Sequence, residues 1–158
     1  KSQGMLPADL DIIVADAHHV ERWALMRAAL WPEESIAEHR EDILALLRQG
    51  DGKGITLLAL DAREEAIGFA EVALRHDYVN GCETSPVVFL EGIYVDPNAR
   101  RRGVAAALTR AAADWGRAKG CTEMASDADI ANAASHGFHA AIGFAETERV
   151  VYFRRPIG

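Results

Sequence analysis

Hydrophobic residues in the first third of the chain recur every three or four positions, which is the spacing of a helix with one buried face. The first such run, residues 20–31, stops at Pro32, which cannot continue a helix. The second covers residues 35–48, and Ser35, with Glu38 three residues later, is a typical helix start. The pattern therefore predicts two helices near the N-terminus.

The apolar pattern then becomes typical of strands, after a glycine-rich turn. Ile55–Leu60 and Ala66–Arg75 predict a hairpin, because a short charged turn separates them. The next run, Val87–Val95, is so apolar that we expect a central strand of the sheet. Glu91 and Gly92 interrupt this run, and a glycine inside a strand often marks a bulge.

The second half of the chain predicts alternating helices and strands. Val104–Lys119 has the clearest helical spacing, and Gly120 follows it. We further expect a short strand at Cys121–Ser126, a helix at Asn132–Ala141 and a final strand at Phe144–Phe153. This order of elements predicts a mixed α/β single domain.

The composition and net charge of the chain limit the classes of partner that it can bind. The chain has 158 residues, 49% of them hydrophobic and 26% charged, as in ordinary globular domains. No apolar stretch approaches the roughly 20 residues of a membrane-spanning helix, so no membrane partner is expected. The net charge of -7 disfavours nucleic acid and favours a cationic partner.

The two cysteines indicate the cellular compartment, and the first residues indicate where the domain begins. Cys82 and Cys121 form no Cys-x-x-Cys pair, so a reducing, cytoplasmic compartment fits best. The first five residues contain no apolar signal core. We expect residues 1–4 to be foreign to the native protein and residues 5–158 to form the domain.

A basic loop follows the central strand. Asp96-Pro97 ends the strand, three arginines follow at 100–102, and Gly103 opens the helix that begins at Val104. A strand, a tight turn and a helix N-terminus present free amides and part of the helix dipole to an anion, and a diphosphate would fit there. The alternative is a solvated basic turn. The loop matches neither the Walker nor the dinucleotide-binding pattern.

The run Val95-Asp96-Pro97-x-x-Arg100-x-x-Gly103-Val104-Ala105-x-x-Leu108 resembles the coenzyme A signature of the GNAT superfamily of N-acetyltransferases, Arg/Gln-x-x-Gly-x-Gly/Ala. A second family signature is recognisable in Asn132, position 139 and Gly143-Phe144. The resemblance runs from about Asp11 to the end of the chain. It implies a single-domain GNAT fold, with a mixed, mostly antiparallel sheet, a splayed central strand and about four helices.

The same resemblance implies acetyl-CoA as cosubstrate. The residues it assigns to the cofactor are Ile93, Tyr94, Val95, Arg100, Arg101, Arg102, Gly103, Val104, Ala105, Ala106, Asn132 and His139. His139 stands where many family members have a tyrosine thought to protonate the departing thiolate. The histidine can do this, or it can be a packed helix residue. His136 and His139, without a third ligand nearby, predict no metal site.

Longer strings resemble the aminoglycoside 6'-N-acetyltransferases within that superfamily. They are Leu30–Pro32, Arg75–Cys82, Ser85–Ile93, Glu123–Asp127, Gly143-Phe144 and Glu146–Val150. The resemblance places five residues at the acceptor: Trp31, Tyr78, Glu91, Asp127 and Glu148. Carboxylates and aromatic faces suit a polycationic sugar. Each of the five also has a structural explanation, such as core packing, a turn, an exposed charge or, for Glu91, an ion pair.

The expected reaction is direct attack of the 6'-amine of an aminoglycoside on acetyl-CoA in a ternary complex, which confers resistance to the antibiotic. Glu91 and Asp127 are the candidate proton acceptors, because the attacking amine must be neutral. Two alternatives stay open: acetylation of another small cationic amine, such as a polyamine or an amino-acid derivative, and a non-catalytic acyl-CoA-binding module. The resemblance also implies a homodimer, with the final strand and its neighbouring helix near the partner.

Overall fold

The computed structural model describes residues 9–158, so the expected domain start at residue 5 lies outside the described residues. Along the chain the elements are β1 (Asp11–Val14), η1 (Ala17–His19), α1 (Val20–Leu30), α2 (Ile36–Gln49), β2 (Gly54–Leu60), β3 (Ala66–Arg75), β4 (Val87–Val95), η2 (Pro97–Ala99), α3 (Val104–Ala118), β5 (Met124–Ser126) and α4 (Ala133–Ala141). No helix within residues 9–158 is long and apolar enough to cross a membrane.

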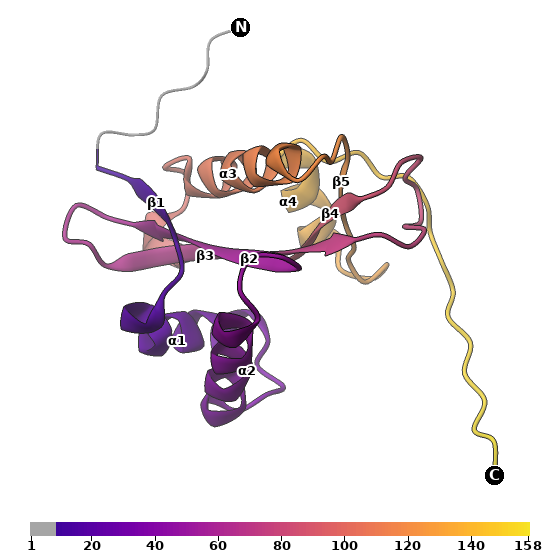
Figure 1. The fold of residues 1–158 in the computed structure, drawn as a ribbon, viewed down its shortest axis with the longest axis horizontal. Coiled ribbons are helices and arrows are strands. Elements are labelled where there is room, and N and C mark those ends of the chain that lie inside the picture. The colour runs from indigo at the N-terminus through magenta and orange to yellow at the C-terminus, as the bar shows by residue number, and fades with distance from the viewer. Residues whose placement is uncertain (1–8) are drawn as a thin grey trace, which may run out of the picture.

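One five-stranded sheet in the order β1-β2-β3-β4-β5 forms the centre of the fold. The first four strands are antiparallel to their neighbours, and β5 runs parallel to β4. Figure 1 shows the sheet edge-on, with α3 on one face and α1 and α2 on the other. The predicted mixed, mostly antiparallel sheet with four α-helices is therefore confirmed.

Each face of the sheet buries its own apolar layer. On the α3 side, Leu90 of β4 packs in one cluster with Leu108 of α3. On the α1 side, Phe69 of β3 packs with Trp23 of α1 and Ile43 of α2. The two predicted helices on this side are confirmed within one residue at each end. Burial on both faces explains why the inner strands are apolar almost throughout.

The predicted interruption of the central strand is a β-bulge. Glu71 of β3 pairs with Gly92, and the next residue, Val72, pairs with Leu90, so Glu91 has no partner on β3. A bulge bends its strand and can turn one side chain away from the regular alternation. Glu91 is accordingly exposed although the residues before it in β4 are buried.

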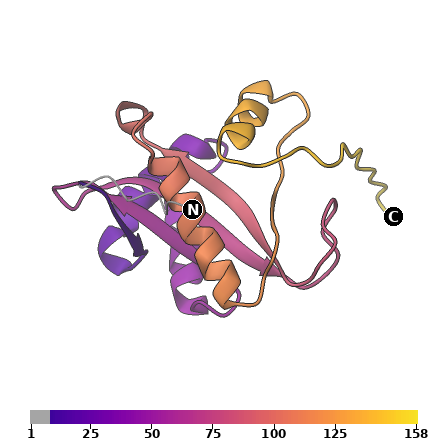
Figure 2. The same ribbon diagram turned by 90° about the horizontal axis from the view of Figure 1, so that it is seen from above.

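The expected strand at Phe144–Phe153 is wrong for this chain. Residues 144–158 form no strand, and Tyr152 and Phe153 are 83% and 92% exposed. Apolar alternation alone does not make a strand, because the backbone also needs a neighbour with free hydrogen-bonding groups. The described tail instead leaves the domain on the side of β5 (Figure 2). The short strand β1 was not predicted, and β5 begins at Met124 rather than Cys121.

Helix α3 lies directly on β4 through a glycine. A methyl group at Gly116 would lie 2.1 Å from Cγ2 of Val88, a stiff and buried side chain. In α4, a methyl at Gly137 would meet nothing within 4 Å.

These two helical glycines give a matched test of the packing. Gly116→Ala should lower the free energy of unfolding by about 1–3 kcal/mol, because overpacking outweighs the gain in helix propensity. Gly137→Ala should leave it unchanged or raise it by up to about 1 kcal/mol. Urea denaturation measures both, and equal effects of the two substitutions would contradict the described contact.

Candidate active site

The loop before α3 has the backbone of an anion-binding turn. Arg101 and Gly103 have φ angles of +65° and +78°, in the left-handed region. The amide of Ala107 donates to the carbonyl of Gly103 at 3.0 Å as the first turn of the helix closes. The amides of Val104 to Ala106 precede this bond and therefore have no acceptor within the helix. Together they present positive potential to the solvent.

The arginines of this loop are exposed, but two of them also make contacts within the chain. Arg100 donates from Nε to the carbonyl of Val95 at 3.2 Å, which fastens the loop to the end of β4. Arg102 forms an ion pair of 2.6 Å with Asp9, and both side chains are about half exposed. Amide donors and guanidinium groups thus meet at one helix end, as the binding of a diphosphate requires.

The pairing of β4 with β5 stops in the middle of β4. The last pair is Leu90 with Ser126, where β5 ends, whereas β4 continues to Val95. From Glu91 onward, the edge of β4 that faced β5 has no strand partner among the described residues. On that side the stretch from Ile93 to Val95 has no neighbouring strand, although the Val95 carbonyl already accepts a hydrogen bond from Arg100.

The two candidate catalytic residues, Glu91 and Asp127, lie where this opening begins. Glu91 and Asp127 each follow a member of the last β4–β5 pair, so parallel register puts them at the same level of the sheet. Both residues are exposed. The structure thus brings the two acids to one end of the strand pair.

Glu91 already has a partner in the chain. Its Oε1 lies 3.0 Å from Nη2 of Arg75, and about 40% of each side chain is exposed. The Arg75 guanidinium also lies 3.6 Å from the centre of the Phe89 ring. The alternative role of Glu91 in an ion pair therefore applies, but at the surface, where such a pair contributes little to stability and remains open to solvent. Sequence reasoning did not identify Arg75.

His139 lies where α4 meets β5. Its Nδ1 is 2.7 Å from the carbonyl oxygen of Ser135, and its Nε2 is 2.8 Å from Oγ of Ser126. The Ser126 hydroxyl in turn donates to the carbonyl of Leu90 at 3.2 Å, so contacts run from His139 through Ser126 to the last pair of β4 with β5. The ring also contacts Phe138 and Phe144 edge-on. His139 is thus a packed residue that reaches the end of the β4–β5 pair.

Asn132 is the N-cap of α4. Its side-chain oxygen accepts a hydrogen bond of 3.0 Å from the amide of Ser135. Asparagine is among the preferred residues at this position. The cap explains an asparagine here without any ligand, and sequence reasoning did not predict it.

Trp31 follows the last residue of α1 and lies on the bulge of β4. A methyl group at Gly92 would lie 2.4 Å from Cζ2 of Trp31, so the indole rests directly on the strand backbone next to Glu91. The ring is half-buried and lies 6.0 Å from Phe69 between ring centres. Trp31, Glu91 and Asp127 thereby approach the same part of β4.

Tyr78 and Glu148 lie elsewhere, on the connection between β3 and β4 and on the C-terminal tail. Tyr78 is 76% exposed. A methyl at Gly81 in the same connection would lie 2.1 Å from Oγ1 of Thr147, so the tail passes this connection just before Glu148. The two residues therefore share one region of the surface. Figure 1 shows the tail beside this connection.

The β3–β4 connection is fastened to the strand β5 by Glu123. The backbone amides of Glu83 and Thr84 donate to its carboxylate at 2.9 Å and 2.7 Å, and the Thr84 hydroxyl donates to the same oxygen. These bonds to the charged form, the Thr84 hydroxyl first, lower the pKa of the Glu123 carboxyl. The loop that carries Tyr78 is thus held at one end by an ionised side chain.

A cavity of about 530 Å³ lies between α2 and the sheet. Its lining includes Trp23, Leu47, Thr56, Glu71 and Glu91. Glu91 therefore faces a space of the size that small-molecule sites have. This space is on the α1 side of the sheet, opposite the layer formed by α3.

Glu71, which lines this cavity, belongs to a buried ion pair that sequence reasoning missed. Both oxygens of Glu71 accept hydrogen bonds from Nη1 of Arg27, and Oε2 also accepts one of 2.9 Å from the Trp23 indole. Each residue of the pair is 7% exposed. Burial raises the pKa of the Glu71 carboxyl, whereas the Arg27 charge and the hydrogen bonds lower it and offset part of that effect.

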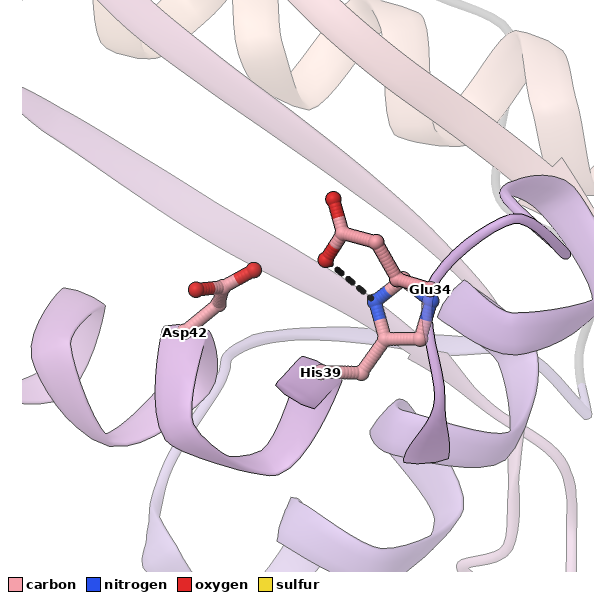
Figure 3. A group of neighbouring side chains, drawn as sticks. All are labelled: Glu34, His39 and Asp42. Atoms are coloured by element: carbon pink, nitrogen blue, oxygen red, sulfur yellow. Dashed lines mark ion pairs between the residues drawn. The ribbon is translucent and has the colours of Figure 1, made fainter. Parts of the chain in front are cut away.

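Three possible metal ligands, Glu34, His39 and Asp42, lie together at the start of α2 (Figure 3), with ligand atoms within 4.8 Å of one another. Arg27 occupies the same space. Its Nε donates to Nδ1 of His39 at 3.2 Å, and its Nη2 lies 3.4 Å from Asp42. The Arg27 guanidinium occupies the lone pair of His39 Nδ1 that a metal ion would need, and its positive charge repels a cation. These residues therefore form an ion-pair network rather than a metal site.

Comparison with known proteins identifies relatives over nearly the whole chain. The profile of the acetyltransferase (GNAT) family matches residues 19–144. An aminoglycoside N(6')-acetyltransferase type 1 of Serratia marcescens is 48% identical over 147 residues, which cover 93% of this chain and 99% of that protein.

Solved structures are similar as well. The crystal structure of the aminoglycoside 6'-N-acetyltransferase AAC(6')-Ih from Acinetobacter baumannii has a TM-score of 0.88 and 40% identity, covering 94% of this chain and 99% of that one. AAC(6')-Iy in complex with the bisubstrate analogue CoA-S-monomethyl-acetylneamine has a TM-score of 0.86 and 46% identity, covering 95% and 100%.

Proposed function

Because this chain belongs to the acetyltransferase (GNAT) family, we propose that it transfers the acetyl group of acetyl-CoA to the 6'-amino group of aminoglycosides and so confers resistance to them. The observation that carries the proposal is the 48% identity, over 93% of the chain, with a protein of that name. The geometry adds independent support, because β4 has an open edge that begins between two acids, Glu91 and Asp127, and leads to the loop before the N-terminus of α3.

Acetyl-CoA is proposed to bind along the opening between β4 and β5. The amides of Val104 to Ala106, with Gly103 and the three arginines, would hold the diphosphate. Ile93, Tyr94 and Val95 would line the pantetheine arm, and the backbone groups on the edge of β4 that has no strand partner among residues 9–158 would hydrogen-bond its amides. Asn132 and His139 are proposed to lie farther along the same cofactor.

The acceptor is proposed to bind on the α1 side of β4. Its ammonium groups need carboxylates, which Glu91, Asp127 and Glu148 supply, and its sugar rings need flat apolar surface, which Trp31 and Tyr78 supply. The net charge of -7 favours the approach of a polycation. We propose no metal in this reaction.

The proposed chemistry is a direct attack in a ternary complex. The neutral 6'-nitrogen forms a bond to the thioester carbon, the carbon–sulfur bond breaks, and coenzyme A leaves as its thiolate. Glu91, directly or through water, takes the proton from the amine, and Asp127 shares that role or orients the amine. Amides near the bulge would stabilise the oxyanion. His139 is a candidate to protonate the thiolate.

The cysteines are poor candidates for an acetyl-enzyme. Both Cys82 and Cys121 are free thiols, and burial raises the pKa of each, so little thiolate forms near neutral pH. Two free thiols also fit a reducing compartment, and we propose a cytoplasmic location.

Thiol release from acetyl-CoA tests the function. We expect release with kanamycin, which has a 6'-amine, and none from that position with paromomycin, which has a 6'-hydroxyl. Glu91→Gln should lower kcat with kanamycin by about 100-fold, the scale of a lost general base, and leave the affinity for acetyl-CoA within about twofold. Glu41→Gln, at an exposed position of α2, is the matched control. Release with spermidine or a lysine peptide but no aminoglycoside would contradict the proposal.

We also propose that the protein is a homodimer in which the C-terminal tail contacts the partner. The support is the exposure of Val151, Tyr152 and Phe153 on a tail with no strand pairing in the described chain. Sedimentation should give a dimer at micromolar concentration, and replacing Tyr152 and Phe153 by lysine should give a folded monomer. A monomeric parent protein, or a dimer unaffected by both lysines, would overturn the proposal.

A further inference from the structure

A closed circuit of contacts joins the buried ion pair to the bulge of β4. Glu71 is the cross-strand partner of Gly92, and its carboxylate binds Arg27 of α1. The Arg27 guanidinium lies 4.9 Å from the centre of the Trp31 ring. The Trp31 indole in turn rests on Gly92, and this contact closes the circuit. Each member of the circuit is therefore held on two sides.

His39 of α2 contacts two members of this circuit, Arg27 and Trp31. The residue is completely buried, and its Nδ1 accepts a hydrogen bond from Nε of Arg27. A neutral imidazole with an acceptor at Nδ1 carries its proton on Nε2, which lies 2.9 Å from the carbonyl oxygen of Trp31. The two ring nitrogens thus have defined and opposite roles.

Trp31 lies just after α1, so the hydrogen bonds of the helix hold only part of its backbone. The amide of Trp31 donates to the carbonyl of Arg27 at 2.7 Å, but its carbonyl lies beyond the last turn of α1 and needs another donor. His39 is that donor. Its ring also stacks on the indole, with centres 6.4 Å apart and planes at 26°. Backbone and side chain of Trp31 are both held by the same imidazole.

We propose that His39 is a positioning residue of the acceptor site, which holds the Trp31 indole against Gly92 next to Glu91. The inference rests on the proposed function, in which Trp31 and Glu91 contact the aminoglycoside. It assigns a role to a side chain that does not itself touch the substrate. Loss of the Nε2 donor should loosen Trp31 and weaken acceptor binding, while the acetyl-CoA site on the other side of β4 stays intact.

Two polar variants of similar burial separate this role from general stability. In His39→Gln the side-chain amide reaches the position of Nε2 and can donate to the Trp31 carbonyl. In His39→Asn the amide is one carbon too short. We expect His39→Asn to raise the KM for kanamycin by roughly tenfold, the effect of one lost buried hydrogen bond, with the KM for acetyl-CoA and kcat within about twofold. His39→Gln should stay within about threefold of the parent protein.

Ile43→Ala is the control for lost stability in the same helix, because Ile43 is fully buried and belongs to the apolar cluster. It should lower the unfolding temperature without raising the KM for kanamycin. Equal kinetics of the Gln and Asn variants, a rise of both KM values, or the same rise in Ile43→Ala would overturn the role of His39.

A spectroscopic readout separates this inference from the proposed function. The chain has three tryptophans, so 5-fluorotryptophan labelling gives three ¹⁹F resonances, and Trp31→Phe assigns one of them. His39→Asn should shift or broaden the Trp31 resonance and leave that of Trp115 in place. This result holds even if no aminoglycoside is acetylated. An unchanged Trp31 resonance in His39→Asn would contradict the inference even if kanamycin is a substrate.

Discussion

The ion pair between Arg27 and Glu71 is the constraint on which the helical layer below the sheet depends. A buried charge without a partner lowers the stability of the fold, and pairing offsets much of that cost. Arg27 of α1 must therefore lie against Glu71 of β3, which fixes the position of α1 on the sheet. The Trp23 indole and the His39 imidazole complete the hydrogen bonds of the pair. As a result, α1 and α2 have a fixed position relative to the sheet at the point where β4 bulges.

The bulge of β4 is the second feature on which the site depends. In a regular strand, Glu91 would have a partner on β3, and a buried glutamate there would need a counter-charge. The extra residue instead leaves Glu91 at the surface, and just beyond it β5 stops pairing with β4. One irregularity thus exposes an acid, frees a strand edge and leaves Gly92 bare for the Trp31 ring. The proposed acetyl transfer would use each of these elements.

Local features of this fold were predictable because they depend on neighbouring residues. Ser35 caps α2 through the amide of Glu38, as its position indicated, and Gly103 lies in the tight turn expected before α3, where its φ is positive. The interrupted run at Glu91 and Gly92 likewise predicted an irregular strand. The candidate acids Glu91 and Asp127 were named from resemblance, and the register of β4 with β5 puts them at one level of the sheet.

Features that depend on distant partners were not predictable from the sequence. Glu71 and Arg27 are 44 residues apart, and nothing in the local pattern distinguishes either from a surface charge. Arg75 beside Glu91 was missed for the same reason. The tail at Phe144–Phe153 has the residues of a strand, but a strand also requires backbone pairing, and among the described residues the tail pairs with no strand.

A double-mutant cycle on Arg27 and Glu71 tests this account most directly. Arg27→Met and Glu71→Gln should each lower the free energy of unfolding by about 3–5 kcal/mol, because each leaves a buried charged or polar partner unsatisfied. The double variant should lose much less than the sum of the two, with a coupling of at least about 2 kcal/mol. Additive losses would contradict the claim that this pair organises the layer beneath the site.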